Sequence, residues 1–329
     1  MVLIFSSFKK ADLSKSLLVL LICKVVYLLV AVLGSKDWAG WAFQGFFTYN
    51  VSKWYFLSVL LGMVMQMIIM WRIDDWMYTI GCYQGTRHTA LWFTFLVLHA
   101  HPMLSHASAF LALILLMVLF LEGNFTLSKK ELTLNYTANH GVLMGLMAWV
   151  HFVLFPVLVI SYSPRLQDSR DRFRHTLVLL FFGCLVWGIL ESIPLIKMGS
   201  FSLGAFIGHG LPLFDLFGQS AFTWTPSLIV TTGCGIIAMF SIILKEVAQQ
   251  RFRHVLRNIL FVYGLLAGLI LIHSHYETAF FLLLAPALII TLVRGFEQIQ
   301  NRVFFEMVSI LWFGTILLDL LGVFVLFDF

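Results

Sequence analysis

Apolar runs long enough to cross a lipid bilayer recur along this chain and decide its fold class. The runs at 176–194 and 222–244 are two examples, each close to the roughly 20 residues that a transmembrane helix needs. Charged residues make up only 11% of the chain. An average soluble domain carries about 25%. The sequence therefore predicts an all-α, polytopic transmembrane helical bundle, with residues 1–329 forming a single transmembrane domain.

We expect about eight to ten crossings, some of them made by short or broken helices. The expected spans are 16–34, 55–71, two helices within 89–122, 141–162, 176–194, 222–244, 258–273, 278–293 and 305–326. Residues 72–88 are expected to form an amphipathic segment. The run at 141–162 contains a polar joint at His151 and Pro156, so two short helices that enter and leave on one side are an alternative to one crossing.

The basic residues predict the orientation of these spans. Most of the 21 Lys and Arg residues fall into loops on one side, which the positive-inside rule assigns to the cytoplasm together with the N-terminus. The side of the loop at 123–138 stays open. We expect a multi-pass protein of the bacterial inner (cytoplasmic) membrane whose partner is membrane lipid. The net charge of +5 is explained by these loops and does not require nucleic acid.

The stretch HAHPMLSH, from His99 to His106, interrupts the longest apolar run. About 34 residues in one straight helix would extend roughly 50 Å, beyond a hydrocarbon core of about 30 Å. Pro102 also removes a backbone donor. The sequence predicts two helices that meet near the outer face and direct His99, His101 and His106 into an outward-facing polar cavity. No acid or cysteine lies nearby to complete a ligand set, so we expect no metal and no cofactor here.

Three charged residues lie inside expected spans, where burial costs several kcal/mol without a partner. They are Lys24, Glu191 and Asp319. Pairing with one another as structural contacts is the favoured interpretation, and a polar transport path is the alternative. Glu191, shortly before Pro194, is the best placed to line a cavity.

Two other clusters favour structural roles. A short outer loop, rather than a metal triad, is the interpretation of His273, His275 and Glu277. Helix capping of the segment that follows explains Asp74 and Asp75. No Walker A, GxSxG or HExxH motif is present, and no pair of spans is dominated by GxxxG. No motif therefore names a reaction.

The order of two long stretches resembles that of a known family. These are TRHTALWFTFLVLHAHPMLSHASAFLALILLMVLF and ANHGVLMGLMAWVHFVLFPVLVISYSPRLQDSRDRFRHTLVLLFFGCLVWGILESIP. The pattern looks like an uncharacterised multi-pass inner-membrane protein family of Bacteroidota. More distantly, it resembles the membrane domain of the GT-C glycosyltransferases, with HAHPMLSHASAFL, GVLMGLMAW, FPVLVI and SPRLQDSRDRFR as the corresponding parts.

The GT-C resemblance implies a polyprenyl-phosphate-sugar donor and an acid in the first outer loop that acts as the catalytic base. Asp37 is the residue at that position. The histidines at the outer ends of the helices would contact the donor phosphate: His99, His101, His106 and, from the 195–221 loop, His209. The usual acidic pair and a large C-terminal periplasmic domain are missing, so whether the chain is an enzyme stays open.

Three classes of function follow. The first is a non-catalytic subunit or scaffold of an envelope or glycoconjugate-related membrane complex, with membrane proteins as partners, because paired acids are scarce and the loops short. The second is a GT-C-type glycosyltransferase with Asp37 as its base. The third is a transporter or lipid-handling protein in which Glu191, Lys24 and Asp319 form the polar path. A redox protein with haem held between histidines is a remaining alternative.

Overall fold

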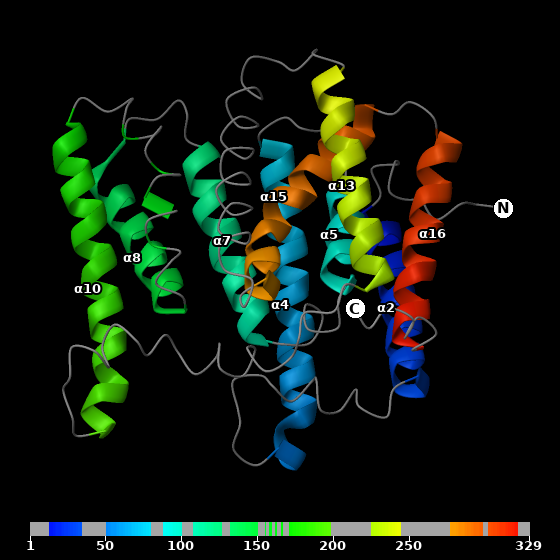
Figure 1. Ribbon diagram of the computed structural model, residues 1–329, viewed down its shortest axis with the longest axis horizontal. Coiled ribbons are helices and arrows are strands. Elements are labelled where there is room, and N and C mark those ends of the chain that lie inside the picture. The colour runs from blue at the N-terminus through cyan, green and yellow to red at the C-terminus, as the bar shows by residue number, and fades with distance from the viewer. Residues whose placement is uncertain are drawn as a thin grey trace. The chain divides into compact units, whose positions relative to one another are not determined.

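The computed structural model describes residues 13–34, 51–79, 88–100, 108–126, 132–150, 155, 158–159, 162, 166, 171–198, 225–244, 277–298 and 302–321. Every regular element within these residues is a helix, which confirms the all-α expectation. The helices, coloured along the chain in Figure 1, are α2 (Leu13–Gly34), α4 (Val51–Thr79), α5 (Thr89–His99), α7 (Ser108–Thr126), α8 (Leu134–Val150), α10 (Arg172–Met198), α13 (Pro226–Leu244), α15 (Glu277–Gln298) and α16 (Arg302–Leu320).

Most helices coincide with expected spans, and two differ. α4 continues past the predicted end at 71 to Thr79. The prediction of a separate amphipathic segment at 72–88 is therefore wrong for its first part, which belongs to α4. The helix continues because Ile69, Ile73 and Trp76 recur at helical spacing and are each fully buried. α8 begins at Leu134, before the predicted start at 141, and ends at Val150, next to the predicted joint. The span expected at 258–273 lies outside the described residues.

The long apolar run at 89–122 divides into two helices, as predicted. α5 ends at His99, and the N–H of Ala100 turns back to the carbonyl oxygen of Val97 at 3.2 Å, which closes the helix with a tighter turn. α7 begins at Ser108. The histidine-rich stretch, from His99 to His106, therefore falls between the end of α5 and the start of α7.

The described helices belong to two compact units. The first unit comprises residues 1–115, 222–256 and 281–329, and the second comprises 116–221 and 257–280. In the first unit α5 packs against α2, α4 and α16, and α13 packs along α16. Every described residue of α5 is buried, which makes this helix the centre of that unit.

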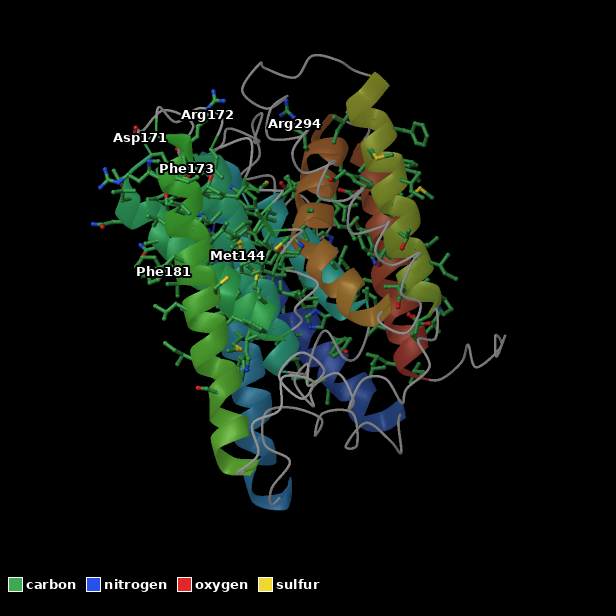
Figure 2. All side chains as sticks on the ribbon, turned by 60° about the vertical axis from the view of Figure 1, so that its left-hand side comes forward. Met144, Asp171, Arg172, Phe173, Phe181 and Arg294 are labelled. Atoms are coloured by element: carbon green, nitrogen blue, oxygen red, sulfur yellow. The ribbon has the colours of Figure 1, made fainter. Side chains whose placement is uncertain are left out.

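Two helices are long and apolar enough to cross a membrane, by length and composition among the described residues. They are Leu13–Val30 in α2 and Arg172–Leu190 in α10. α10 carries large exposed apolar side chains four residues apart along one face, namely Phe173, Leu177, Phe181, Leu185 and Ile189. Figure 2 shows Phe173 and Phe181 on the side of α10 that points away from α8, the helix that carries Met144.

Glycines allow the backbones of α8 and α10 to approach closely in the second unit. A Cβ added to Gly141 would lie 2.6 Å from the carbonyl oxygen of Leu179, and one added to Gly145 would lie 2.5 Å from that of Gly183. The two α8 glycines are four residues apart, the small-xxx-small arrangement of membrane helix pairs. The expectation that no GxxxG pair organises the helices is therefore wrong for α8 and α10, which lie side by side in Figure 1.

Candidate functional site

A lysine on the apolar helix α2 is buried inside the first unit. Lys24 is only 7% exposed. Its Nζ lies 3.0 Å from Oε1 of Gln66 on α4 and 2.8 Å from Nε2 of His99 on α5. It also lies 5.1 Å from the ring centroid of Tyr27, about one turn along α2. An ammonium has three N–H donors. Each has one partner here: an amide oxygen, an imidazole nitrogen and the face of an aromatic ring.

The hydrogen bonds of His99 decide which of its ring nitrogens carries the proton. Nδ1 lies 2.6 Å from the backbone oxygen of Phe95, and a carbonyl oxygen only accepts, so Nδ1–H is the donor. In the neutral ring Nε2 then carries no proton and accepts from Lys24. The imidazole stacks on Phe95 at a centroid distance of 4.1 Å and meets Tyr27 edge-on at 4.6 Å. These contacts hold Nε2 toward Lys24.

The groups around Lys24 are polar but uncharged. No carboxylate in the described part of the chain lies within salt-bridge distance of its Nζ, so the neutral dipoles of Gln66 and His99 and the ring of Tyr27 stabilise it. A buried ammonium without an opposite charge loses several kcal/mol of hydration, which hydrogen bonds to neutral groups offset only in part. Burial of Lys24 therefore costs more free energy than is needed to hold three helices together.

A second group of polar contacts joins the end of α5 to the start of α13. The carbonyl oxygen of Ala100 accepts hydrogen bonds from the hydroxyl of Ser227 at 2.5 Å and from that of Thr225 at 3.4 Å. Thr225 is also the N-cap of α13, since its Oγ1 accepts from the N–H of Leu228 at 3.3 Å. Pro226, in the first position of the helix, has no N–H to satisfy.

The start of α13 also binds a carboxylate from α16. Oδ2 of Asp319 accepts a hydrogen bond of 2.7 Å from the backbone N–H of Ser227. A negative group at a helix N-terminus meets unpaired N–H donors and the positive end of the helix dipole. His99 and Ala100 are adjacent, so this junction continues directly from the site of Lys24. We call the whole set the polar centre: Lys24, Gln66, His99, Ser227 and Asp319.

A histidine–carboxylate pair lies at the other end of α5. His88, the N-cap residue, has φ 76°, a left-handed backbone conformation in which histidine is enriched among non-glycine residues. Its Nδ1 lies 2.8 Å from Oδ2 of Asp74 on α4. His88 and His99 are about three helical turns apart. Between them Trp92 and Phe95 stack at a centroid distance of 5.7 Å, so an aromatic layer separates the two polar ends of α5.

The structure brings together only some of the residues that the sequence singled out. His99 lies in the polar centre, together with Lys24 and Asp319. Lys24 and Asp319 are not paired with each other, so the predicted mutual pairing is wrong for these two. Both are held instead by neutral groups of other helices. Asp74 does not cap a following helix, because α4 continues beyond it and its carboxylate binds His88.

The remaining predicted site residues are not placed by the structure. Asp37, His101, His106, His209, His273 and His275 lie outside the described residues. Glu191 and Glu277 belong to α10 and α15, but their side chains lie outside the described set. Within that set no group of three His, Cys, Asp or Glu side chains is arranged to hold a metal ion.

Sequence reasoning did not single out Gln66 or Ser227. Gln66 had a usable signal, as the only amide inside the apolar part of α4, and it is 2% exposed. Ser227 follows Thr225 and Pro226, a common helix start, but nothing local predicts that Asp319, 92 residues away, binds its N–H. Comparison with protein-family models, curated proteins and solved structures found no match to the chain.

Proposed function

We propose that the chain is a multi-pass integral membrane protein that transports a small solute or ion. The membrane part of this proposal is supported by the distribution of polarity. Leu, Ile, Val and Phe dominate the exposed faces of α2, α10 and α16, whereas Lys24 and His99 are buried. A soluble protein has the opposite arrangement, since its exposed helix faces are polar. The bacterial inner membrane and a cytoplasmic N-terminus stay predictions.

Membrane integration has a direct test in the native host. We expect the full-length chain to sediment with membranes and to stay in the pellet after alkaline carbonate, because its apolar helices contact lipid rather than bind a membrane protein at the surface. Detergent should release it. The distribution between pellet and supernatant is measured by immunoblotting, with a known peripheral protein as the control. Release by carbonate alone would contradict membrane integration.

Buried Lys24 is the observation that carries the transport proposal. Ionisable residues inside membrane segments are costly to bury, and in transport proteins they mark substrate, ion or proton paths. Lys24 has no compensating carboxylate among the described residues, and its three partners come from α2, α4 and α5. A pair of apolar side chains would join these helices at lower cost.

The position of the break in the helices also supports transport. α5 ends at His99, and the N-terminus of α13 meets this end while binding the carboxylate of Asp319. Secondary transporters place their substrate and coupling ions at such interrupted helices, where helix ends supply polar backbone groups. Lys24 and His99 lie at the same interruption. The polar centre therefore resembles a translocation site more than a catalytic one.

A non-catalytic subunit is the second candidate. It is favoured because the contacts of the polar centre are made within the chain, so this hydrogen-bond network stabilises the packing of the helices without any ligand. The glycosyltransferase hypothesis depends on Asp37, which lies outside the described residues, and it stays a prediction. The two leading candidates differ in whether the polar centre opens to water from both sides.

Cysteine labelling at the polar centre tests transport without knowledge of the solute. Ala100 is 1% exposed and lies between His99 and the start of α13. Ala100→Cys is introduced into a chain whose four native cysteines are replaced by alanine. Right-side-out and inside-out vesicles that contain this variant are then treated with a membrane-impermeant methanethiosulfonate. We expect labelling in both orientations, because alternating access opens the site to each side in turn.

The matched control is Ala148→Cys on α8, since Ala148 is also 1% exposed but lies among packed helices. It should stay unlabelled from either side. Protection of Ala100→Cys in both orientations would reject transport and leave the subunit candidate. Labelling from one side only would also reject alternating access, since it indicates a fixed pocket.

A further inference from the structure

We propose that Lys24 and His99 together bind a single proton, and that this proton is the coupling ion of the transport proposed above. The inference rests on the proposed function only in its second part. The first part, proton binding by the pair, concerns the geometry of these two side chains and is tested separately.

The two nitrogens are placed for direct proton transfer. Nζ of Lys24 and Nε2 of His99 are 2.8 Å apart, the length of a strong hydrogen bond with a charged donor. In the transfer step one N–H bond of the Lys24 ammonium breaks and an N–H bond forms at Nε2. The products are a neutral amine and an imidazolium, and the lone pair left on Nζ accepts the new Nε2–H. The pair carries one positive charge before and after.

Each form of the pair keeps its other hydrogen bonds. With the proton on Lys24, its three donors meet Nε2, Gln66 and the ring of Tyr27. With the proton on His99, Nδ1–H still donates to the carbonyl oxygen of Phe95, and the amine keeps two N–H groups for Gln66 and Tyr27. No group must rotate or lose a partner, so the proton moves without rearranging the site.

The pair exists in two protonation states, one neutral and one with a single added proton, and it does not bind a second proton. A second proton would place two positive charges 2.8 Å apart in a poorly solvated interior, where like charges repel strongly. Nζ of Lys24 contacts Gln66, His99 and Tyr27, and no carboxylate in the described part of the chain lies within salt-bridge distance of it to offset this repulsion. The acidic, basic and histidine side chains with described surroundings on the packed elements α4, α5 and α16 are, besides His99, Arg72, Asp74, Asp75, His88, Glu306 and Asp319. Asp74 binds His88 and Asp319 binds the N–H of Ser227.

Loss of the proton weakens the contacts between three helices. A charged hydrogen bond is roughly twice as strong as a neutral one, and the cation–π contact with Tyr27 needs the charge. The protonated pair therefore holds α2 to α4 and α5, and deprotonation loosens α2. Water that reaches the opened site accepts the proton from Nε2 of His99. Proton binding and helix movement are coupled in this way, as proton-driven transport requires.

The test is a coupled titration of the full-length chain in lipid nanodiscs. The protein is labelled with ¹⁵N in histidine and ¹³C at Cε of lysine, and NMR follows both labels with pH. The two signals are assigned by their loss in Lys24→Arg and His99→Gln, which keep a donor and an acceptor at their positions. We expect the Lys24 and His99 signals to change with one common midpoint, because interacting groups titrate as a pair.

Separate midpoints for the two signals, or no change in either across the pH range in which the protein stays folded, would overturn the proposal. Labelling of Ala100→Cys gives the independent result on transport. A common midpoint with protection of Ala100→Cys from both sides would keep the proton site and reject transport. Double-sided labelling with separate midpoints would keep transport and reject the proton site.

Discussion

Gly145→Ala is expected to lower the free energy of unfolding by about 1–3 kcal/mol, the range of substitutions that overpack a tight contact. The added Cβ would lie 2.5 Å from the carbonyl oxygen of Gly183 and 2.9 Å from Cβ of Val186. A backbone oxygen cannot rotate away as the end of a flexible side chain can. α8 and α10 must therefore separate, and the close packing that their small residues allow is lost.

Gly188→Ala is the matched control, because Gly188 lies in α10 and an added Cβ there would meet no atom within 4 Å from the described residues outside its own helical turn. Since alanine is the better helix former, this change should be neutral or stabilise by up to about 1 kcal/mol. The free energies are compared by reversible unfolding in mixed micelles. Equal values for the two variants would show that α8 and α10 are not in contact at Gly145.

The helices were predictable because their signal is local. An apolar run, a proline or a glycine acts within a few residues, so the break between His99 and Ser108 followed from run length and Pro102 alone. The predicted end of α4 is too early because the charges of Arg72 and Asp74 indicate the end of a membrane span. The buried stripe that extends the helix to Thr79 depends on packing that hydropathy does not report.

The polar centre was only partly predictable. Lys24 and Asp319 stand out in the sequence as charges in apolar runs, but their partners lie 42, 75 and 92 residues away in sequence. A single sequence contains no information on which distant residues meet. The sequence does not distinguish His99 from His101 and His106. In the structure Nδ1 of His99 binds within α5 and leaves Nε2 for Lys24, whereas the other two lie outside the described residues.

The α8 glycines show a different limit. Gly141 and Gly145 have the spacing of a packing motif, yet nothing in their own segment identifies the partner. The partner carries Gly183, one glycine among apolar neighbours, and the contact involves backbone oxygens that no side-chain pattern reports. Such contacts are recognised only when both helices are seen together.

Asp319→Ala is expected to destabilise the first unit by about 1–3 kcal/mol, the cost of leaving a buried donor without its acceptor. The substitution removes the acceptor 2.7 Å from the backbone N–H of Ser227. Loss of the negative charge at the start of α13 adds about 0.3–1 kcal/mol. Asp319→Asn keeps an acceptor oxygen and loses only the charge, so it should lie between Asp319→Ala and the wild type.

Asp75→Ala on α4 is the matched control, because Asp75 is exposed and its carboxylate makes no hydrogen bond with another described residue, whereas its backbone oxygen accepts from Thr79. It should change the free energy of unfolding by no more than about 0.5 kcal/mol. The same mixed-micelle measurement serves all three variants. If Asp319→Ala and Asp75→Ala were equally stable, the carboxylate would not hold the start of α13. The junction between α5 and α13 would then depend on the hydrogen bonds that Ser227 and Thr225 donate to the carbonyl oxygen of Ala100.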